Sequence, residues 1–236
     1  MNHETGHRKI FGRRRGRRLG SRQLFNFRER AAEYQIPGVG QTENPERSPV
    51  DLADCGVRQG GQPVWLEIGF GYGEHLSHLA RVYPDTNFIG CEHYVNGVAR
   101  LVGELFESRI GNVRIHAGDV RDLLEVLPGE SIDRAYLLYP DPWPKRRHFS
   151  RRFVTPQYLD LLDRALKSGA ELRVATDIGS FVAQALEQML FRMKYEWPAC
   201  SPKDWRERWT DGMSTRYERK ALREARVPTY LTFIKP

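Results

Sequence analysis

Cysteine is scarce in this chain of 236 residues, and long apolar stretches are missing from it. Its three cysteines, Cys55, Cys91 and Cys200, lie far apart without a C-x-x-C pair, which argues against a disulfide framework and fits a reducing cytoplasm. No run of about eighteen apolar residues predicts a transmembrane helix, and the N-terminus lacks the apolar core of a signal peptide. The histidines show no metal-ligand grouping, so no metal is expected. We therefore expect a cytoplasmic protein, away from membranes, of a size that suits one α/β domain.

Positive charge is abundant but unevenly placed. Residues 1–20 hold seven basic residues against the single acid Glu4, so this segment carries six of the seven net positive charges. It has no hydrophobic periodicity and is predicted to be a flexible arm, with a merely solvated tail as the alternative. A second basic cluster lies within residues 145–152. Two such patches, rich in arginine, on a nearly neutral body favour a polyanionic partner.

The rest of the chain is organised around an apolar run at residues 64–68 that ends in a glycine-rich turn. The turn has the spacing G-x-G-x-G, formed by Gly69, Gly71 and Gly73. Helical spacing follows over residues 74–82, and a strand, glycine turn and helix in this order let a backbone approach a nucleoside-type ligand. A dinucleotide site would need G-x-G-x-x-G, and Glu67 before the turn would repel a pyrophosphate. That acid suits the cationic methionine part of S-adenosylmethionine (SAM), which is the cofactor we expect.

Predicted strands and helices alternate along the chain. Apolar runs predict strands near residues 64–68, 87–91, 113–117, 132–139, 171–175, 193–197 and 230–234. This alternation predicts a seven-stranded, mostly parallel sheet with helices on both faces. The expected organisation is an arm over 1–20, an N-terminal segment with a short helix and a loop over 21–61, and an α/β domain over 62–236.

Acidic residues recur at or just after the C-terminal ends of the predicted strands. They are Glu67, Glu92, Asp119, Asp141 and Asp177. Open α/β sheets bind ligands at this edge, and chance would scatter acids to both ends of the strands. Glu92 could accept the ribose hydroxyls of SAM, and Asp119 could accept the adenine amino group.

The most distinctive stretch, residues 139–152, combines prolines, aromatic residues and arginines. Three prolines stiffen the chain just past a predicted strand and should fix Asp141 and Trp143 at the edge of the sheet. A rigid acid and an aromatic ring beside basic residues suit a base lifted out of an RNA, which would be stacked, hydrogen-bonded and held by its phosphates. A solvated, proline-rich loop is the alternative.

These stretches together resemble the bacterial tRNA (guanine-N7)-methyltransferase family. The resemblance rests on P-D-P-W-P-K-R-R-H at residues 140–148 and on segments 66–76, 90–92, 175–177 and 215–220, whose order and spacing match that family over roughly residues 60–235. Tyr139 departs from it where many members have Phe, and Phe149-Ser150 interrupts a segment that is often more basic. The family implies a Rossmann-like class I methyltransferase fold and methyl transfer from SAM to N7 of guanine 46 in the variable loop of tRNA.

The resemblance and the residue types together give a set of expected contacts. The SAM contacts are Glu67, Gly69, Gly71, Gly73, Glu92, Asp119 and Asp141. The tRNA contacts are Lys145, Arg147, Arg151, Arg152, Asp177, Thr215, Arg216, Tyr217 and Glu218. Thr215-x-x-Glu218 also fits a capping box that opens a helix, and both readings can hold.

Guanine N7 carries an unprotonated lone pair, so its methylation requires no base to remove a proton. Catalysis should come from in-line positioning, helped by carboxylates that stabilise the positive charge gained by the ring. Asp141 is the candidate catalytic residue, as a holder of the guanine or the cofactor, with proton abstraction as the less favoured role. A non-catalytic RNA-binding module and a SAM enzyme acting on a small molecule remain alternatives, and the sequence does not decide between monomer and dimer.

Overall fold

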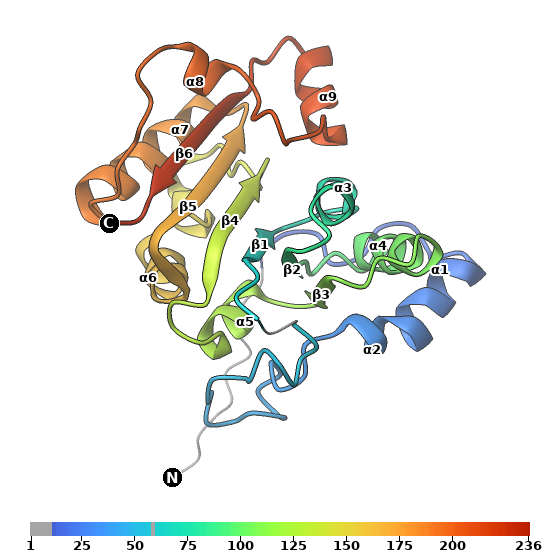
Figure 1. The fold of residues 1–236 in the computed structure, drawn as a ribbon. Helices are drawn as coiled ribbons and strands as arrows, with labels where there is room; N and C mark the ends of the chain where they lie inside the picture. Colours follow the sequence, from blue (N-terminus) through green and yellow to red (C-terminus); the bar gives the residue numbers. More distant parts are fainter. Residues whose placement is uncertain (1–10, 58–59) are drawn as a thin grey trace.

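The computed structural model describes residues 11–57 and 60–236, which fold around a six-stranded sheet (Figure 1). The strands lie in the order β3-β2-β1-β4-β5-β6, and all neighbours are parallel except β5 and β6. The strands are β1 (Val64–Ile68), β2 (Asn87–Cys91), β3 (Val113–His116), β4 (Ile132–Leu138), β5 (Leu166–Thr176) and β6 (Thr229–Ile234). The predicted α/β class with a mostly parallel sheet is confirmed.

The predicted strand at residues 193–197 is the one difference in the sheet. It is reduced to a single antiparallel bridge, in which Glu196 and Ile234 exchange two N–H···O bonds of 2.9 Å. The next hydrogen-bonding positions on either side are 194 and 198. Lys194 has a left-handed φ of 60°, and Pro198 has no N–H to donate, so the ladder cannot extend in either direction.

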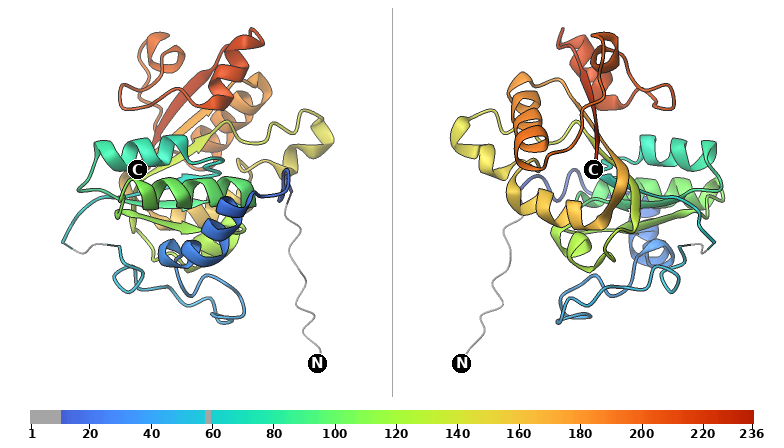
Figure 2. Two further views of the ribbon diagram at one scale, coloured as in Figure 1. Left: turned by 90° about the vertical axis from the view of Figure 1, so that its right-hand side faces the viewer. Right: turned by 60° about the vertical axis from the view of Figure 1, so that its left-hand side comes forward.

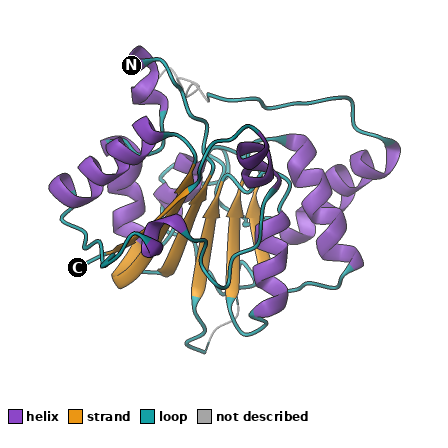
Figure 3. Ribbon diagram, turned by 90° about the horizontal axis from the view of Figure 1, so that it is seen from above, coloured by secondary structure: helices purple, strands orange, loops and turns teal. Residues whose placement is uncertain are grey.

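Helices cover both faces of the sheet, as predicted (Figures 2 and 3). From β1 onward the helices are α3 (Glu74–Val82), α4 (Val95–Glu107), α5 (Val120–Val126), α6 (Pro156–Ala165), α7 (Gly179–Leu186), α8 (Lys203–Arg206) and α9 (Arg216–Arg223), with a 3₁₀ turn over Arg146–Arg151 and a π-helical turn over Glu187–Arg192. Of these, α9 lies beyond the strand ends (Figure 1). None of the helices in the described part of the chain is both long and apolar enough to span a membrane.

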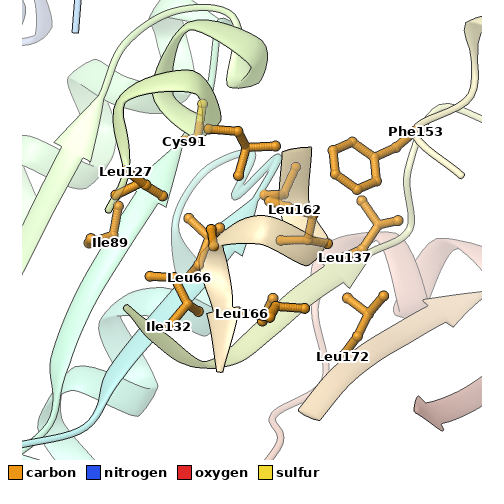
Figure 4. Close-up of a cluster of buried hydrophobic side chains, with 14 of the residues drawn as sticks. Leu66, Ile89, Cys91, Leu127, Ile132, Leu137, Phe153, Leu162, Leu166 and Leu172 are labelled. Carbon is orange, nitrogen blue, oxygen red and sulfur yellow. The ribbon is translucent and has the colours of Figure 1, made fainter. Parts of the chain in front are cut away.

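Alternation along β1 divides the core into two layers. Val64, Leu66 and Ile68 join the cluster that includes residues of α5, α6 and α7, part of which is drawn in Figure 4. Trp65 points to the other face and packs with residues of α3 and α4. Successive side chains of a strand alternate between faces, so Glu67 lies on the same face as Trp65. This placement decides the environment of Glu67.

The N-terminal segment packs along the body of the domain. Its predicted short helix is confirmed as α1 (Ser21–Phe25), a π-helical turn over Asn26–Arg30 and α2 (Ala31–Tyr34), which lie beside α4 (Figure 1). Ahead of it, Gly16 N donates to Asn96 Oδ1 (2.8 Å), Asn96 Nδ2 donates to Arg17 O (2.8 Å), and Val95 N donates to Arg14 O (3.0 Å). The second half of the arm therefore runs along the start of α4. Residues 1–10 lie outside the described residues, and the flexibility of the arm and the segment boundaries remain predictions.

Candidate functional site

A cavity of about 660 Å³ opens at the C-terminal edge of the parallel strands. Its walls come from the ends of β1, β2 and β4, the start of α5, the loop after β4, α9, and arm residues Phe11 and Arg13. Of the five predicted acids, Glu92, Asp119 and Asp141 line this cavity, whereas Glu67 and Asp177 do not. The structure therefore brings together three of the acids that follow strands.

The glycine turn forms one wall of the cavity with its backbone. Gly69, Gly71 and Gly73 have left-handed φ values of 74°, 58° and 77°, a conformation that costs most other residues energy. Nothing lies within 4 Å of a Cβ atom placed on Gly69, while one placed on Gly97 of α4 would lie 1.8 Å from Gly71 O. The turn thus packs tightly against α4 on one side and leaves room for a ligand at Gly69. Gly73 itself caps α3 and does not line the cavity.

Glu92 is buried and held rigidly at the end of β2. Its Oε2 accepts the Gly71 N–H (2.7 Å), and its Oε1 accepts the Tyr94 N–H (2.8 Å). A carboxylate offers about four lone-pair positions, so two backbone donors leave capacity for a pair of hydroxyl donors from the cavity. The neighbouring His93 Nε2 is a buried polar atom without a hydrogen-bond partner in the described structure, and His93 also lines the cavity. This wall fits a polar ligand group such as a ribose.

Asp119 has a capping role that the sequence analysis did not include. It is the N-cap of α5, where its carboxylate accepts the Arg121 backbone N–H (2.9 Å) and pairs with the Arg121 guanidinium. The Arg121 guanidinium lies 5.6 Å from the centre of the Tyr158 ring, and Tyr158 lines the same end of the cavity. An aromatic ring and a capped helix start suit a flat heterocycle, and the contact of Asp119 with adenine remains a prediction.

Asp141 follows β4 on a strained backbone. Tyr139 and Trp143, on either side of it, both have left-handed φ values, 48° and 37°, which are unusual for aromatic residues. The Asp141 side chain is exposed to solvent, but partial desolvation by neighbouring atoms raises the pKa of its carboxyl. The charge of His93 partly offsets this rise. The arm passes directly over this group, because a Cβ atom on Gly12 would lie 3.0 Å from Asp141 Oδ2.

Arg152 corrects one prediction of an RNA contact. Its side chain is 1% exposed, and burial lowers the pKa of its guanidinium, which stacks 3.6 Å from the centre of the Phe149 ring. Its hydrogen bonds run to Pro142 O (2.9 Å), Trp143 O (3.3 Å), Ser180 O (2.9 Å), Ser180 Oγ (2.9 Å) and Gln184 Oε1 (3.0 Å). These five bonds use all five guanidinium donors. Arg152 ties the loop that carries Asp141 to α7, and no donor is left for a phosphate.

The other bases of this loop remain available at the surface. Arg151 lines the cavity, and its guanidinium lies 4.7 Å from the Phe11 ring centre and 4.9 Å from that of Trp143. Lys145 and Arg147 are exposed at the 3₁₀ turn, outside the cavity lining. A cation that contacts two aromatic rings at the cavity is consistent with a site for a nucleobase.

Glu67 does not reach the cavity, contrary to expectation. It is 3% exposed, and its Oε2 lies 2.8 Å from His75 Nδ1 of α3. The pattern of the strand explains this, since Glu67 shares the face of Trp65. Asp177 is likewise engaged, by an ion pair with Arg226. The structure gives both acids intramolecular partners.

In the segment 215–218, two residues have structural roles at the start of α9 and two line the cavity. Thr215 Oγ1 caps α9 by accepting the Glu218 N–H (3.2 Å), and the buried Glu218 accepts from Arg208 Nη1 (3.1 Å) rather than closing the full capping box. Arg216 and Tyr217 line the cavity, whereas Thr215 and Glu218 lie behind it. The capping interpretation therefore holds for Thr215 alone, and contact of this segment with tRNA remains a prediction.

Several residues of the cavity lining were not predicted individually as site residues from the sequence. They are Phe11, Arg13, Tyr72, His93, Tyr94, Tyr158, Arg219, Lys220 and Arg223. For the last three, helical spacing from Arg216 was a usable signal. The aromatic residues carried none, because tyrosines in α/β domains more often pack. Within residues 11–57 and 60–236, no three His, Cys, Asp or Glu side chains gather as a metal site would require.

Known proteins resemble this chain over almost its whole length. A family model described as "Putative methyltransferase" matches residues 61–230. The tRNA (guanine-N(7)-)-methyltransferase of Roseobacter denitrificans is 52% identical over 97% of this chain and 97% of that protein. The tRNA (guanine-N(7)-)-methyltransferase of Bartonella henselae is 42% identical over 99% of this chain and 98% of that protein. Among solved structures, the 16S rRNA methyltransferase KamB has a TM-score of 0.58 at 15% identity, over 80% of this chain and 95% of that chain, which is a likeness of fold.

Proposed function

The chain belongs to the tRNA (guanine-N7)-methyltransferase family, and from this premise we propose how its cavity works. The enzyme transfers the methyl group of SAM to N7 of a guanine in tRNA. We take the target to be guanine 46 of the variable loop, as the sequence resemblance implies. The observation that carries the site assignment is the convergence of Glu92, Asp119 and Asp141 on one cavity beside a left-handed glycine turn.

The residues of the cavity fit SAM. Open space at Gly69, the fixed carboxylate of Glu92 and the end formed by Asp119 and Tyr158 would hold its methionine part, ribose and adenine in turn. Bound SAM supplies an electrophilic methyl group on a sulfonium. The remaining volume beside Asp141, Trp143 and Tyr217 leaves a place for the guanine.

Asp141 would hold the guanine in place. On its base edges, guanine presents acceptors at N7 and O6 and donors on the opposite edge, so a carboxylate can bind only the donor edge. That contact would select guanine over adenine and turn N7 toward the methyl group. Because N7 has no proton to lose, the enzyme needs alignment and a negative environment for the developing ring charge, and Asp141 supplies both. Proton abstraction by Asp141 is the less favoured role.

Methyl transfer to unmodified tRNA tests the function. With labelled SAM we expect 7-methylguanine at one mapped position, and a G-to-A change there should abolish labelling. Salt-sensitive tRNA binding without SAM binding would instead identify a non-catalytic RNA module. Turnover of a small substrate that is independent of the arm would identify a small-molecule methyltransferase. Because the proposed enzyme acts on tRNA, we place it in the cytoplasm.

Replacing Glu92 by Gln should weaken SAM binding about 10- to 100-fold. The amide would point a donor at one of the two backbone N–H groups that now fix the carboxylate, and a lost or mismatched hydrogen bond of this kind costs about 1–3 kcal/mol. Calorimetry with SAM measures the effect, with Glu107→Gln on the exposed side of α4 as the control. Unchanged affinity would remove Glu92 from the cofactor site.

A further inference from the structure

One face of α9 carries a row of cations along the cavity. Arg216, Arg219, Lys220 and Arg223 occupy positions i, i+3, i+4 and i+7, which share one side of a helix. All four line the cavity, and all four are exposed. The row is separate from the two basic patches that the sequence analysis assigned to RNA.

The other side of α9 anchors the helix in the domain. Glu218 and Ala221 are buried, Thr215 caps the first turn, and Arg208 pairs with Glu218 at 3.1 Å. Arg216 is also fixed, because its backbone N–H donates to Glu74 Oε2 (3.0 Å) and its guanidinium lies 4.3 Å from the centre of the Tyr72 ring. The cations of α9 therefore project from a helix that is anchored firmly in the domain.

The outer three cations have only loose acidic neighbours. Arg219 Nη1 donates to Ser214 O (2.7 Å), and its Nη2 lies 3.8 Å from Oε1 of the partly buried Glu74. Lys220 Nζ lies 3.9 Å from Glu224 Oε1, between exposed side chains. Arg223 Nε donates to the backbone carbonyl of Arg219 (3.3 Å). Exposed pairs at such distances contribute little, so a phosphate can replace the carboxylates at small cost.

Two acids of the cavity and the cations of α9 differ in depth, and the buried cation Arg152 has all its donors engaged within the protein. Glu92 and Asp119 are buried in its lining, whereas the cations of α9 are exposed. A polyanion that approaches this cavity is attracted to the cations and repelled by the buried acids. A nucleotide would therefore leave its phosphates on α9 and insert only its base.

We propose that Arg219, Lys220 and Arg223 of α9 bind the phosphates of the tRNA backbone next to the target guanine. This inference rests on the proposed function. Arg219 and Arg223 are one helical turn apart, about 6 Å along the axis, so their long side chains can reach successive phosphates. The row would set which nucleotide enters the cavity, while Asp141 selects the base.

The test compares two triple variants that lose the same charge. One is Arg219→Gln, Lys220→Gln and Arg223→Gln; the control is Lys194→Gln, Lys203→Gln and Arg206→Gln, three exposed bases outside the cavity lining. For the α9 variant we expect at least a tenfold rise in the Kd for tRNA. The slope of log Kd against log salt should fall by roughly two units, since each phosphate contact contributes about 0.7 to 0.9. SAM affinity and melting temperature should stay near wild type.

Three outcomes would overturn the proposal. They are an unchanged salt slope, an equal loss in the control variant, or a kcat loss at saturating tRNA without a change in Kd. Failure of the proposed function would be seen separately, as absence of 7-methylguanine with the wild-type enzyme.

Discussion

Asp141→Asn should lower kcat for tRNA methylation about 100- to 1,000-fold while leaving the fold intact. The amide keeps the shape of the side chain but removes the charge that we propose aligns guanine and stabilises the positive ring, and losing one preorganised electrostatic contact typically costs this much. Steady-state kinetics at saturating SAM and tRNA measure the change. Asp160→Asn, at an exposed ion pair with Arg192, serves as the control. A near-normal rate would remove Asp141 from the reaction.

The pH dependence of kcat/KM in the wild-type enzyme gives a second test of the role of Asp141. Partial desolvation raises the pKa of Asp141, so the carboxyl takes up its proton at a higher pH than an ordinary aspartate. In the role we propose for Asp141 the ionised form is the active one, so kcat/KM should fall as the pH drops through that raised pKa. In Asp141→Asn this acid limb should disappear. A solvent isotope effect near one would favour positioning, whereas a large one would favour proton abstraction.

Arg152→Met should lower both stability and turnover, because it removes the hydrogen bonds that link the loop carrying Asp141 to α7. Five partly buried groups that accept from the guanidinium lose their donors, at about 1–3 kcal/mol for each that stays unsatisfied, so we expect a loss of at least about 3 kcal/mol in unfolding free energy. A misplacement of the loop by about 1 Å can cost roughly 100-fold in rate, and we expect kcat to fall on that scale. Denaturant melts and kinetics measure the two effects.

A matched destabilised variant separates positioning from general loss of stability. Leu172→Ala truncates a fully buried side chain in the core cluster that also holds Leu66 of β1, at a typical cost of about 2–5 kcal/mol. This change leaves the loop that carries Asp141 unaltered. Below both melting transitions, Leu172→Ala should keep a near-normal kcat and Arg152→Lys should retain more activity than Arg152→Met, because it keeps the charge and some donors. Equal losses in Leu172→Ala would contradict a positioning role.

The sequence predicts the architecture well and the roles of individual charged residues less well. Apolar runs predict all six observed strands and a seventh, where Lys194 and Pro198 stop a ladder that apolar composition alone favours. An acid at the end of a strand reveals the edge of the sheet but not the face. Glu92 and Asp141 reach the cavity, and Glu67 turns to His75 instead.

Arg152 illustrates the same limit for basic residues. In a run of arginines, a buried one has the same local signature as its exposed neighbours, and only the acceptors contributed by Pro142, Trp143 and α7 distinguish it. Those partners come together through the tertiary fold. The row on α9 was different, because its helical spacing was already visible in the sequence.

The arm passes over Asp141, and this path restricts which residues the arm can carry more than its basic composition suggests. Gly12 adopts a φ of 116° and has no space for a side chain beside Asp141 and His93. Three arginines follow this position directly in the chain, yet an arginine here would have to displace the arm or the carboxylate. A different tail of equal charge could attract the same RNA and still fail to lie across the cavity, so attraction and docking of this segment are separable properties.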